Sequence, residues 1–378
     1  MVNILIAGYH GFGNCGDEAI LRAMVTSFRR LGDDLSLTAL SRDPEFTETQ
    51  YGIQAVPRFN MKEALGAVRR CDVFVLGGGT LLQDGTSTRS LLYYLGLLRG
   101  ACLFRKRVML YANGIGPVSG RVNRMLMRSV LKKVHCITLR EKLSYNDLQS
   151  IGVQNEEVHV TADAAFQLEG VSPERAEALL GAAGAADPEK TRICVSVRKW
   201  SKARYGEDYY GRIAEACDCM AEKGCQIVFL PMQYPEDVGA SRKIAERMKQ
   251  PAVVLSERYS PEEILGIAGR CDVMLSMRLH ALIFAAVQNV PMAGIIYDPK
   301  IDYYLKELDM PDCGDVRTER ISSQRIVSVL EDICRDPEQY RTRLKERADV
   351  MKALAKENDR MLNRQLAAVR KQKEEKGK

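Results

Sequence analysis

The sequence predicts an α/β protein with two Rossmann-like parallel-sheet domains that face each other across a cleft. The chain has 378 residues, which is more than one hydrophobic core usually supports, so two domains of ordinary size are expected. Strand-like apolar runs alternate with amphipathic stretches along most of the chain, a pattern typical of parallel sheets flanked by helices. This alternation stops once, near the middle, and then restarts.

The first half contains six strand-like runs. They are VNILIA (2–7), LSLTAL (35–40), VFVLG (73–77), RVMLYA (107–112), CITLR (136–140) and VHVTA (158–162). Between the first two runs, apolar residues from Ile20 to Leu31 recur at helical spacing, and Gly32 occupies the position of a helix C-cap. This stretch therefore predicts one βαβ unit.

The second half repeats this organisation after a break at 168–191. The break carries two prolines and several glycines, so it predicts a helix followed by a linker. Strand-like runs then return as ICVSVR (193–198), QIVFLP (226–231), AVVLS (252–256), DVMLS (272–276) and MAGIIY (292–297). We therefore divide the chain into an N-terminal Rossmann-like domain (1–167), a helix and linker (168–191), a C-terminal Rossmann-like domain (192–320), and C-terminal helices with a basic tail (321–378).

One internal similarity supports two related domains. The segments RRCDVFVLGGGTL (69–81) and GRCDVMLSMRLH (269–280) each combine a helix end, an Arg-Cys-Asp-Val strand start, and polar or glycine-rich residues after that strand. Aligned on Cys71 and Cys271, they predict corresponding elements of two similar halves. Open α/β sheets bind ligands at the carboxyl ends of their strands, so a cleft between two such edges is the expected ligand site.

Composition and patterning exclude several classes of protein. No apolar run approaches the roughly 18 residues of a membrane span, and the N-terminus lacks the features of a signal peptide, so a cytoplasmic protein is expected. The 11 cysteines lack CxxC spacing and are interpreted as reduced core residues. No His or carboxylate cluster with metal-ligand spacing follows a strand, so no metal site is predicted.

The net charge of +6 is concentrated in the C-terminal tail. Residues 335–378 contain 14 Lys and Arg against 8 Asp and Glu, while the rest of the chain is balanced. Two interpretations stay open: a solvated helical face, or peripheral contact with the anionic inner face of the plasma membrane. Nucleic acid is not expected as a partner, because the tail has almost no aromatic residues to stack on bases.

The segment GYHGFGNCGDEAIL (8–21) follows the first strand and admits three interpretations. The G-x-G-x-x-G pattern of dinucleotide-binding loops is satisfied by Gly11, Gly13 and Gly16. Asp17 and Glu18, however, occupy the first helical turn, where carboxylates satisfy the helix dipole and repel phosphate. The alternatives are a glycine-rich turn with a helix cap, or a loop that holds hydroxyl groups through Asn14 and Asp17.

Two further glycine-containing segments follow strands, GGGTLLQD (77–84) and NGIGP (113–117). Glycine at such positions either permits a tight turn or lets a ligand approach the backbone closely. Gln83 and Asp84 are polar residues beyond a buried strand, and they suit sugar hydroxyls better than phosphate.

Cationic residues follow four of the predicted strands, at Arg140, Arg198, Arg278 and Lys300. A cation at each of four strand ends implies an anionic ligand with more than one charged group. The alternative for any one of them is a structural ion pair, such as Arg140 with Glu141.

The segment SMRLHAL (276–282) contributes one of these cations and a histidine. Ser276, Arg278 and His280 alternate, so an extended segment would place them on one side, just before a helix N-terminus with partial positive charge. A phosphate beside His280 would favour the protonated imidazole, which suits it to act as a general acid. The alternative is a structural histidine. The remaining histidines are weaker candidates: His10, His135 and His159.

Seven motifs together resemble the polysaccharide pyruvyl transferase family, most closely its CsaB-type members. In chain order they are NxGDEAIL (14–21), GGGTLLQD (77–84), GIGP (114–117), LREKLS (139–144), DAAF (163–166), SMRLHAL (276–282) and YDPK (297–300). The resemblance implies a two-domain fold like that of GT-B glycosyltransferases. It also implies transfer of the pyruvyl group of phosphoenolpyruvate onto two sugar hydroxyls as a cyclic ketal, with release of phosphate.

The resemblance also implies roles for individual residues. His280 is the expected general acid, and the expected phosphoenolpyruvate ligands, with the C-terminal domain as the donor side, are Arg140, Arg198, Ser276, Arg278 and Lys300. The acceptor is expected against the N-terminal domain, near Asn14, Asp17, Gln83 and Asp84. In CsaB-type members it is an N-acetylmannosamine unit on a lipid-linked precursor of a secondary cell-wall polymer, which anchors surface-layer proteins. Phosphoenolpyruvate is a co-substrate, and no cofactor is implied.

Two other functions stay open. A glycosyltransferase of the same architecture with a nucleotide-sugar donor would need a ribose-binding carboxylate, for which Asp298 and Glu262 are candidates. A non-catalytic binding module would retain the two domains without the chemistry of His280.

Overall fold

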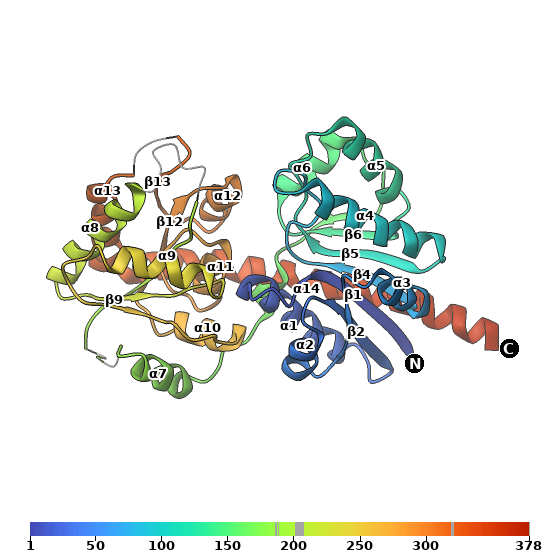
Figure 1. Cartoon of the computed structure of the whole chain (residues 1–378), viewed down its shortest axis with the longest axis horizontal. Coiled ribbons are helices and arrows are strands. Elements are labelled where there is room, and N and C mark those ends of the chain that lie inside the picture. Colours follow the sequence, from blue (N-terminus) through green and yellow to red (C-terminus); the bar gives the residue numbers. More distant parts are fainter. Residues whose placement is uncertain (186, 188, 201–207, 319–320, 378) are drawn as a thin grey trace. The chain divides into compact units, whose positions relative to one another are not determined.

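A computed structural model describes residues 1–185, 187, 189–200, 208–318 and 321–377. The chain forms two compact units, which can be followed by colour in Figure 1. The first unit consists of Met1–Phe12, Asp17–Gln167 and Met351–Lys378, and the second of Gly13–Gly16 and Leu168–Val350. The C-terminal helices are thus divided between the units, and the middle of the glycine-rich loop belongs to the second unit.

The first unit is built on a seven-stranded parallel sheet. Its strands are β1 (Val2–His10), β2 (Leu35–Ser41), β3 (Gln54–Pro57), β4 (Val73–Gly77), β5 (Arg107–Asn113), β6 (Cys136–Leu139) and β7 (Val158–Val160). Their order is β3-β2-β1-β4-β5-β6-β7, the doubly wound arrangement of a Rossmann-like sheet. The six predicted strands are confirmed, and β3 is an additional strand at the edge.

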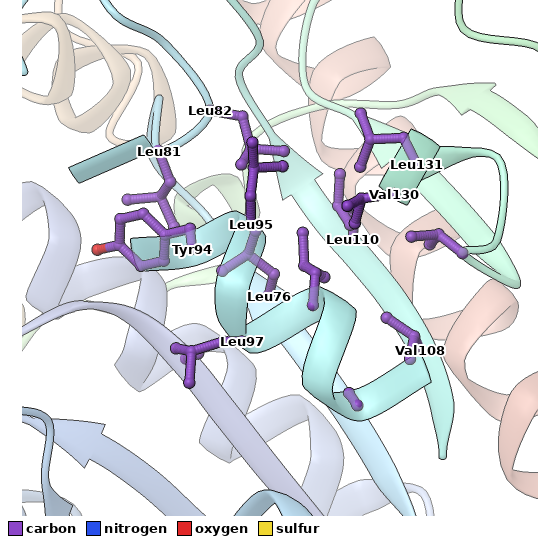
Figure 2. Close-up of a cluster of buried hydrophobic side chains, with 14 of the residues drawn as sticks. Leu76, Leu81, Leu82, Tyr94, Leu95, Leu97, Val108, Leu110, Val130 and Leu131 are labelled. Atoms are coloured by element: carbon purple, nitrogen blue, oxygen red, sulfur yellow. The ribbon is translucent and has the colours of Figure 1, made fainter. Parts of the chain in front are cut away.

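Helices cover both faces of this sheet. They are α1 (Cys15–Arg30), α2 (Pro44–Tyr51), α3 (Met61–Arg70), α4 (Thr88–Leu103), α5 (Arg121–Leu131) and α6 (Lys142–Ile151), followed by the 3-10 helix η1 (Ala164–Gln167). Helices α3 to α6 share one hydrophobic cluster with Leu110 of β5, and Figure 2 shows Leu95 and Leu97 of α4 within it. The next residue, Tyr111, points to the other face, where its ring lies 5.3 Å from that of Phe28 in α1.

The last helix, α14 (Pro337–Gly377), is shared between the units and is anchored in the first by a buried amide. The Asn358 side chain accepts a hydrogen bond from the Thr161 hydroxyl at 2.8 Å and donates to the Ala162 carbonyl at 3.0 Å. Near its end, Arg370 pairs with Asp34 and Lys373 pairs with Asp72. Two cations of the basic tail are therefore neutralised within the first unit. None of the helices in the described part of the chain combines the length and apolarity needed to cross a membrane.

The second unit contains a six-stranded parallel sheet. Its strands are β8 (Arg192–Ser196), β9 (Gln226–Phe229), β10 (Ala252–Val254), β11 (Val273–Ser276), β12 (Met292–Ile296) and β13 (Asp312–Asp315), in the order β10-β9-β8-β11-β12-β13. Its helices are α7 (Pro173–Ala182), α8 (Asp208–Glu222), α9 (Glu236–Ala245), α10 (Pro261–Ala268), α11 (Leu279–Val287), α12 (Pro299–Glu307) and α13 (Ser323–Arg335). The five predicted strands are confirmed, and β13 is additional.

The two similar segments, 69–81 and 269–280, contain strands that occupy the same position in their sheets. Strands β4 and β11 are each the fourth strand of their unit, and each pairs with the first strand. The aspartate before each strand makes equivalent bonds: the Asp72 carboxylate accepts from the Asn3 amide, and the Asp272 carboxylate from the Arg192 amide, both at 2.8 Å. The Arg-Cys-Asp-Val motif therefore fixes the fourth strand against the first in both units.

Candidate active site

The second sheet has its topological switch point between β8 and β11. These strands pair in register, with Ser276 opposite Ser196 at their carboxyl ends. Arg198 and Arg278 each lie two residues beyond the end of their strand. Because crossovers leave a doubly wound sheet in opposite directions at this point, a ligand can approach the strand ends there. Two of the four predicted cations thus flank the natural ligand position of the second unit.

The turn after β11 is shaped by Ser276. Its buried hydroxyl accepts a hydrogen bond from the Arg278 amide at 2.8 Å and donates to the Arg278 carbonyl at 2.9 Å. Helix α11 then begins at Leu279, with Arg278 as its N-cap residue in an extended conformation. The expected one-sided alternation is wrong for His280, because the helix starts before it and places it in the first turn.

Arg278 is held by a carboxylate that the sequence did not single out. Its Nε and Nη2 donate to the two oxygens of Asp237, at 2.8 Å and 2.5 Å, and Nη2 also lies 3.2 Å from Gln233 Oε1. Asp237 is 1% exposed and also accepts the amides of Met232 and Gln233. A bidentate pair at this depth fixes the guanidinium plane, and it also neutralises most of its charge.

His280 packs directly on the glycine-rich loop. A Cβ atom added to Gly16 would lie 2.1 Å from His280 Nδ1, so only glycine leaves room for the imidazole at this position. The loop is attached to the second unit by backbone bonds, from the Cys15 amide to the Met232 carbonyl at 2.8 Å and from the Tyr234 amide to the Gly13 carbonyl at 3.1 Å. The segment 13–16 is therefore fixed to the second unit, with Gly16 against the histidine.

Arg198 has a different environment from Arg278. Its guanidinium lies 4.9 Å from the Tyr297 ring centre and 5.5 Å from that of Trp200, and Nη1 is 3.1 Å from the Tyr297 hydroxyl. Among the residues that the structure describes, no carboxylate forms an ion pair with it, and its Nε is buried without a hydrogen-bond partner. Aromatic faces hold a guanidinium without cancelling its charge, so Arg198 keeps its positive charge for an anion.

Lys300 lies in the first turn of α12, beyond the end of β12. The Asp298 carboxylate accepts the Lys300 amide at 2.9 Å and so caps this helix, while Pro299 provides the first helical residue. The Lys300 side chain is half-buried. The four predicted cations therefore divide as one in the first unit, Arg140, and three at the carboxyl edge of the second sheet.

The N-termini of α11 and α1 differ in how their partial charge is satisfied. Helix α11 has no acidic residue in its first turn, and its N-cap residue makes no side-chain hydrogen bond to the helix, so this N-terminus suits an anion. Helix α1 carries Asp17 and Glu18 there. Glu18 accepts the Gly11 amide at 2.7 Å and the Tyr51 hydroxyl at 2.6 Å. The amide that a pyrophosphate would need is thus bound internally, which argues against dinucleotide binding at this loop.

Arg140 belongs to a buried ionic network in the first unit. Its Nη1 donates to Asp163 at 2.7 Å, its Nε to Glu141 at 2.8 Å, and its Nη2 lies 3.2 Å from the Thr80 hydroxyl. Both carboxylates are fully buried, and the arginine is 4% exposed. The sequence allows two interpretations of Arg140, either an anion ligand or a member of a structural ion pair. The contacts with Asp163 and Glu141 favour the structural ion pair.

The residues predicted to bind hydroxyl groups have local partners as well. Asn14 Oδ1 accepts the Gly16 amide at 3.0 Å, and Gln83 Oε1 accepts the Thr86 amide at 3.0 Å. Asp17 lies beside Gly79, where an added Cβ would be 2.9 Å from its Oδ1. The structure places Asp17, Gln83 and Asp84 in the first unit and Asn14 in the second.

Asp84 caps the N-terminus of α5, which has no cap of its own. Its oxygens accept the amides of Ser119 and Gly120 at 2.9 Å and the Asn123 side chain at 2.9 Å. Burial raises the pKa of Asp84, but these hydrogen bonds outweigh burial and lower the pKa from 3.8 to about 2. The carboxylate therefore stays ionised and is a weak base at neutral pH.

The remaining histidines do not compete with His280. His10 is 1% exposed, its ring nitrogens have no hydrogen-bond partner among the described residues, and burial beside Arg58 lowers its pKa to about 3. His135 Nδ1 accepts the Val108 amide at 3.1 Å, and His159 lies 3.2 Å from Glu157. Across residues 1–377, with the undescribed positions set aside, no cluster of three or more His, Cys, Asp or Glu is arranged to hold a metal ion.

Solved structures share this pair of sheets. Anabaena HepE in complex with UDP-glucose has a TM-score of 0.64 at 12% sequence identity, over 98% of this chain and 100% of that chain. MnaA of S. aureus with UDP has a TM-score of 0.66 at 12% identity, over 96% and 95%. UDP-GlcNAc 2-epimerase of Neisseria meningitidis has a TM-score of 0.64 at 11% identity, over 97% and 100%. The fold class is thus a GT-B-like pair of parallel α/β sheets, as predicted.

The sequence itself assigns the chain to one family with this fold. The family described as polysaccharide pyruvyl transferase matches residues 14–299. The chain therefore belongs to the polysaccharide pyruvyl transferase family, as its seven motifs predicted, and it is an enzyme of the pyruvyl transferase class. One relative is the amylovoran biosynthesis protein AmsJ of Erwinia amylovora, with 22% identity over 373 residues, covering 84% of this chain and 89% of that protein.

The contact between Gly16 and His280 predicts a loss of activity without a loss of fold. In Gly16→Ala the new methyl group displaces the imidazole, while alanine is favourable near a helix start. We expect pyruvyl transfer to fall at least roughly tenfold, because catalysis depends on the position of side chains at an active site. A melting temperature near that of the wild type, with full activity retained, would show that the imidazole position is unimportant.

The depressed pKa of Asp84 predicts a pH-dependent stability difference. A lowered native pKa stabilises the fold above the unfolded value of 3.8, and this contribution is lost as the pH falls toward about 2. The wild type is therefore expected to have a higher melting temperature than Asp84→Asn at pH 7, and this difference in melting temperature should become smaller as the pH falls from about 5 to 2. Thermal unfolding monitored by circular dichroism measures this difference in melting temperature. A difference that does not change with pH would contradict the role of the Asp84 carboxylate as the cap of α5.

Proposed function

We propose that this enzyme transfers the pyruvyl group of phosphoenolpyruvate onto two hydroxyls of a sugar as a cyclic ketal and releases phosphate. The observation that carries the proposal is the set at the switch point of the second sheet: Arg198, Arg278 and the N-terminus of α11. Phosphoenolpyruvate carries a carboxylate and a phosphate on three carbons, so it requires several cationic donors close together. Membership of the family supports the same reaction.

His280 is the proposed proton donor. It protonates the methylene carbon of phosphoenolpyruvate, using the π electrons of the C2–C3 double bond, and C2 becomes oxocarbenium-like. A sugar hydroxyl attacks C2 and loses its proton. The C2–O bond to phosphate then breaks with its electron pair, and a second hydroxyl forms the second ketal C–O bond at C2 and loses its proton. Of the two hydroxyl protons, one replaces the proton that His280 gave to the methylene carbon, and the other leaves with phosphate. Positive groups around the departing phosphate stabilise the charge that develops on it.

The predicted ligands take distinct roles in this scheme. Arg198 and Lys300 bind the anionic groups directly, because aromatic contacts leave the charge of Arg198 intact. Arg278 presents donors at a position fixed by Asp237. Ser276 acts as a positioning residue, since its hydroxyl is bonded to the Arg278 backbone. We retain Arg140 as a ligand only through the part of its guanidinium beside Thr80.

The proposed acceptor is an N-acetylmannosamine unit of a lipid-linked precursor of a secondary cell-wall polymer, as in CsaB-type members. Asn14, Asp17 and Gln83 are the proposed hydroxyl ligands. Asp84 is a weak base, because the hydrogen bonds that it accepts lower its pKa to about 2. We therefore assign the role of base to Asp17.

The alternative donor is a nucleotide sugar. The solved structures named above contain UDP, UDP-glucose or UDP-GlcNAc, but at about 12% identity they support the fold alone. Of the two carboxylates considered for ribose, Asp298 already caps α12. Phosphoenolpyruvate is therefore expected to raise the melting temperature more than UDP-sugars do.

The decisive assay measures phosphate release from phosphoenolpyruvate with and without an N-acetylmannosaminide. Release is expected to depend on both substrates, and His280→Ala is expected to lower it by roughly 100-fold or more. His159→Ala is the matched control, because this histidine lies at the surface beside Glu157. If His280→Ala releases phosphate at the wild-type rate, His280 is not the proton donor. If the sugar product carries no pyruvyl group, the proposed reaction is wrong.

A further inference from the structure

A segment of the first unit carries only positive charge. From Gly85 to Arg140 the sequence contains eleven Lys and Arg and no Asp or Glu. This segment forms α4, β5, α5 and β6. Because the chain as a whole has 49 acidic residues, an acid-free run of this length departs from the average composition. Arg140 of this run is buried and paired, so the exposed cations are those on and beside α4 and α5.

Helix α4 presents one outward stripe. After Thr88, the exposed residues fall at alternating steps of three and four, at Arg89, Leu92, Gly96, Arg99 and Leu103. Leu92 is 44% exposed and Leu103 is 69% exposed, and Phe104 directly after the helix is 42% exposed. The opposite side of the helix, with Leu95 and Leu97, enters the core shown in Figure 2. The stripe therefore contains cations next to exposed apolar side chains that do not pack into the hydrophobic core.

Helix α5 repeats this arrangement beside α4. The two helices pack against each other over the same face of the sheet. The exposed positions of α5 and the residue after it are Arg121, Val122, Met125, Arg128, Ser129 and Lys132, with Val122 64% and Met125 54% exposed. We call the exposed residues of α4 and α5, with Phe104, the α4–α5 surface.

The cations of this surface are not neutralised by the protein. Within the described residues, none of Arg89, Arg99, Arg121, Arg128 and Lys132 forms an ion pair. One acidic side chain lies at the edge of this surface: Asp84 accepts the Ser119 and Gly120 amides directly before α5. The basic tail differs, because its Arg370 and Lys373 are paired with Asp34 and Asp72.

We propose that the α4–α5 surface docks the protein on an anionic lipid bilayer. Cations next to exposed Leu, Val, Met and Phe suit an interface where charged headgroups overlie hydrocarbon. A second copy of the same surface is disfavoured by repulsion between like charges. Nucleic acid is disfavoured because the apolar positions are mainly aliphatic, whereas single strands are bound by stacking on aromatic rings. The proposal does not depend on the donor or the acceptor of the reaction.

The test is co-sedimentation of the full chain with phosphatidylcholine vesicles, with and without phosphatidylglycerol. Binding is expected to require phosphatidylglycerol and to weaken as salt is raised. The double variant Arg121→Glu with Arg128→Glu should lower vesicle binding roughly tenfold or more. Its control, Lys345→Glu with Arg347→Glu, makes the same change in net charge on the exposed face of α14 and should bind like wild type.

An uncharged pair of variants tests the apolar contribution. Met125→Gln should weaken binding, whereas Val350→Gln should not, although Val350 is 56% exposed on α14. Circular dichroism and the melting temperature, measured without vesicles, check that each variant is folded. The proposal is overturned if the wild type does not bind vesicles, or binds them equally well without phosphatidylglycerol. It is also overturned if the control variants lose as much vesicle binding as the variants of the α4–α5 surface. A third outcome would assign the surface to nucleic acid instead: the wild type binds single-stranded RNA but not vesicles, and the double variant Arg121→Glu with Arg128→Glu loses the RNA binding.

Discussion

The buried pair between Arg278 and Asp237 is the constraint on which the candidate site depends. Removing either partner would leave an uncompensated charge in a position that is almost fully buried, which typically costs about 3–5 kcal/mol. The pair fixes the N-cap of α11, and the N-cap fixes the first turn that carries His280. The imidazole in turn requires a glycine at position 16. One ion pair thus determines where the proposed proton donor lies.

The predicted cations are not equivalent, and burial explains the difference. Arg140 and Arg278 are almost fully buried and each is matched by carboxylates, as burial of a charge requires. Arg198 is half-buried among aromatic rings, which hold it without neutralising it. In the proposed site, the positive potential for an anionic donor therefore comes from Arg198, Lys300 and the N-terminus of α11, while Arg278 contributes directional donors.

Much of the fold could be predicted from the sequence because buried parallel strands read as continuous apolar runs. The two missed strands, β3 and β13, lie at or near a sheet edge and have the sequences QAVP and DCGD, which lack such a run. At the candidate site, the sequence predicted that SMRLH follows a strand and precedes a helix, but α11 begins at Leu279, so the predicted alternation does not extend to His280. Asp237 was missed because it lies 41 residues from Arg278 along the chain, and the capping role of Asp84 was missed because it depends on Ser119 and Gly120. Contacts of this kind exist only in the folded chain.

The most direct test of the account is the affinity of the enzyme for phosphoenolpyruvate, measured by titration calorimetry in wild type and Arg198→Ala. Loss of a charge-assisted contact should raise Kd by about 10- to 150-fold, which corresponds to about 1.5–3 kcal/mol. The control Arg175→Ala removes an exposed cation of α7 in the same unit and should leave Kd unchanged. Equal affinity of wild type and Arg198→Ala would contradict the claim that the switch point of the second sheet holds the donor.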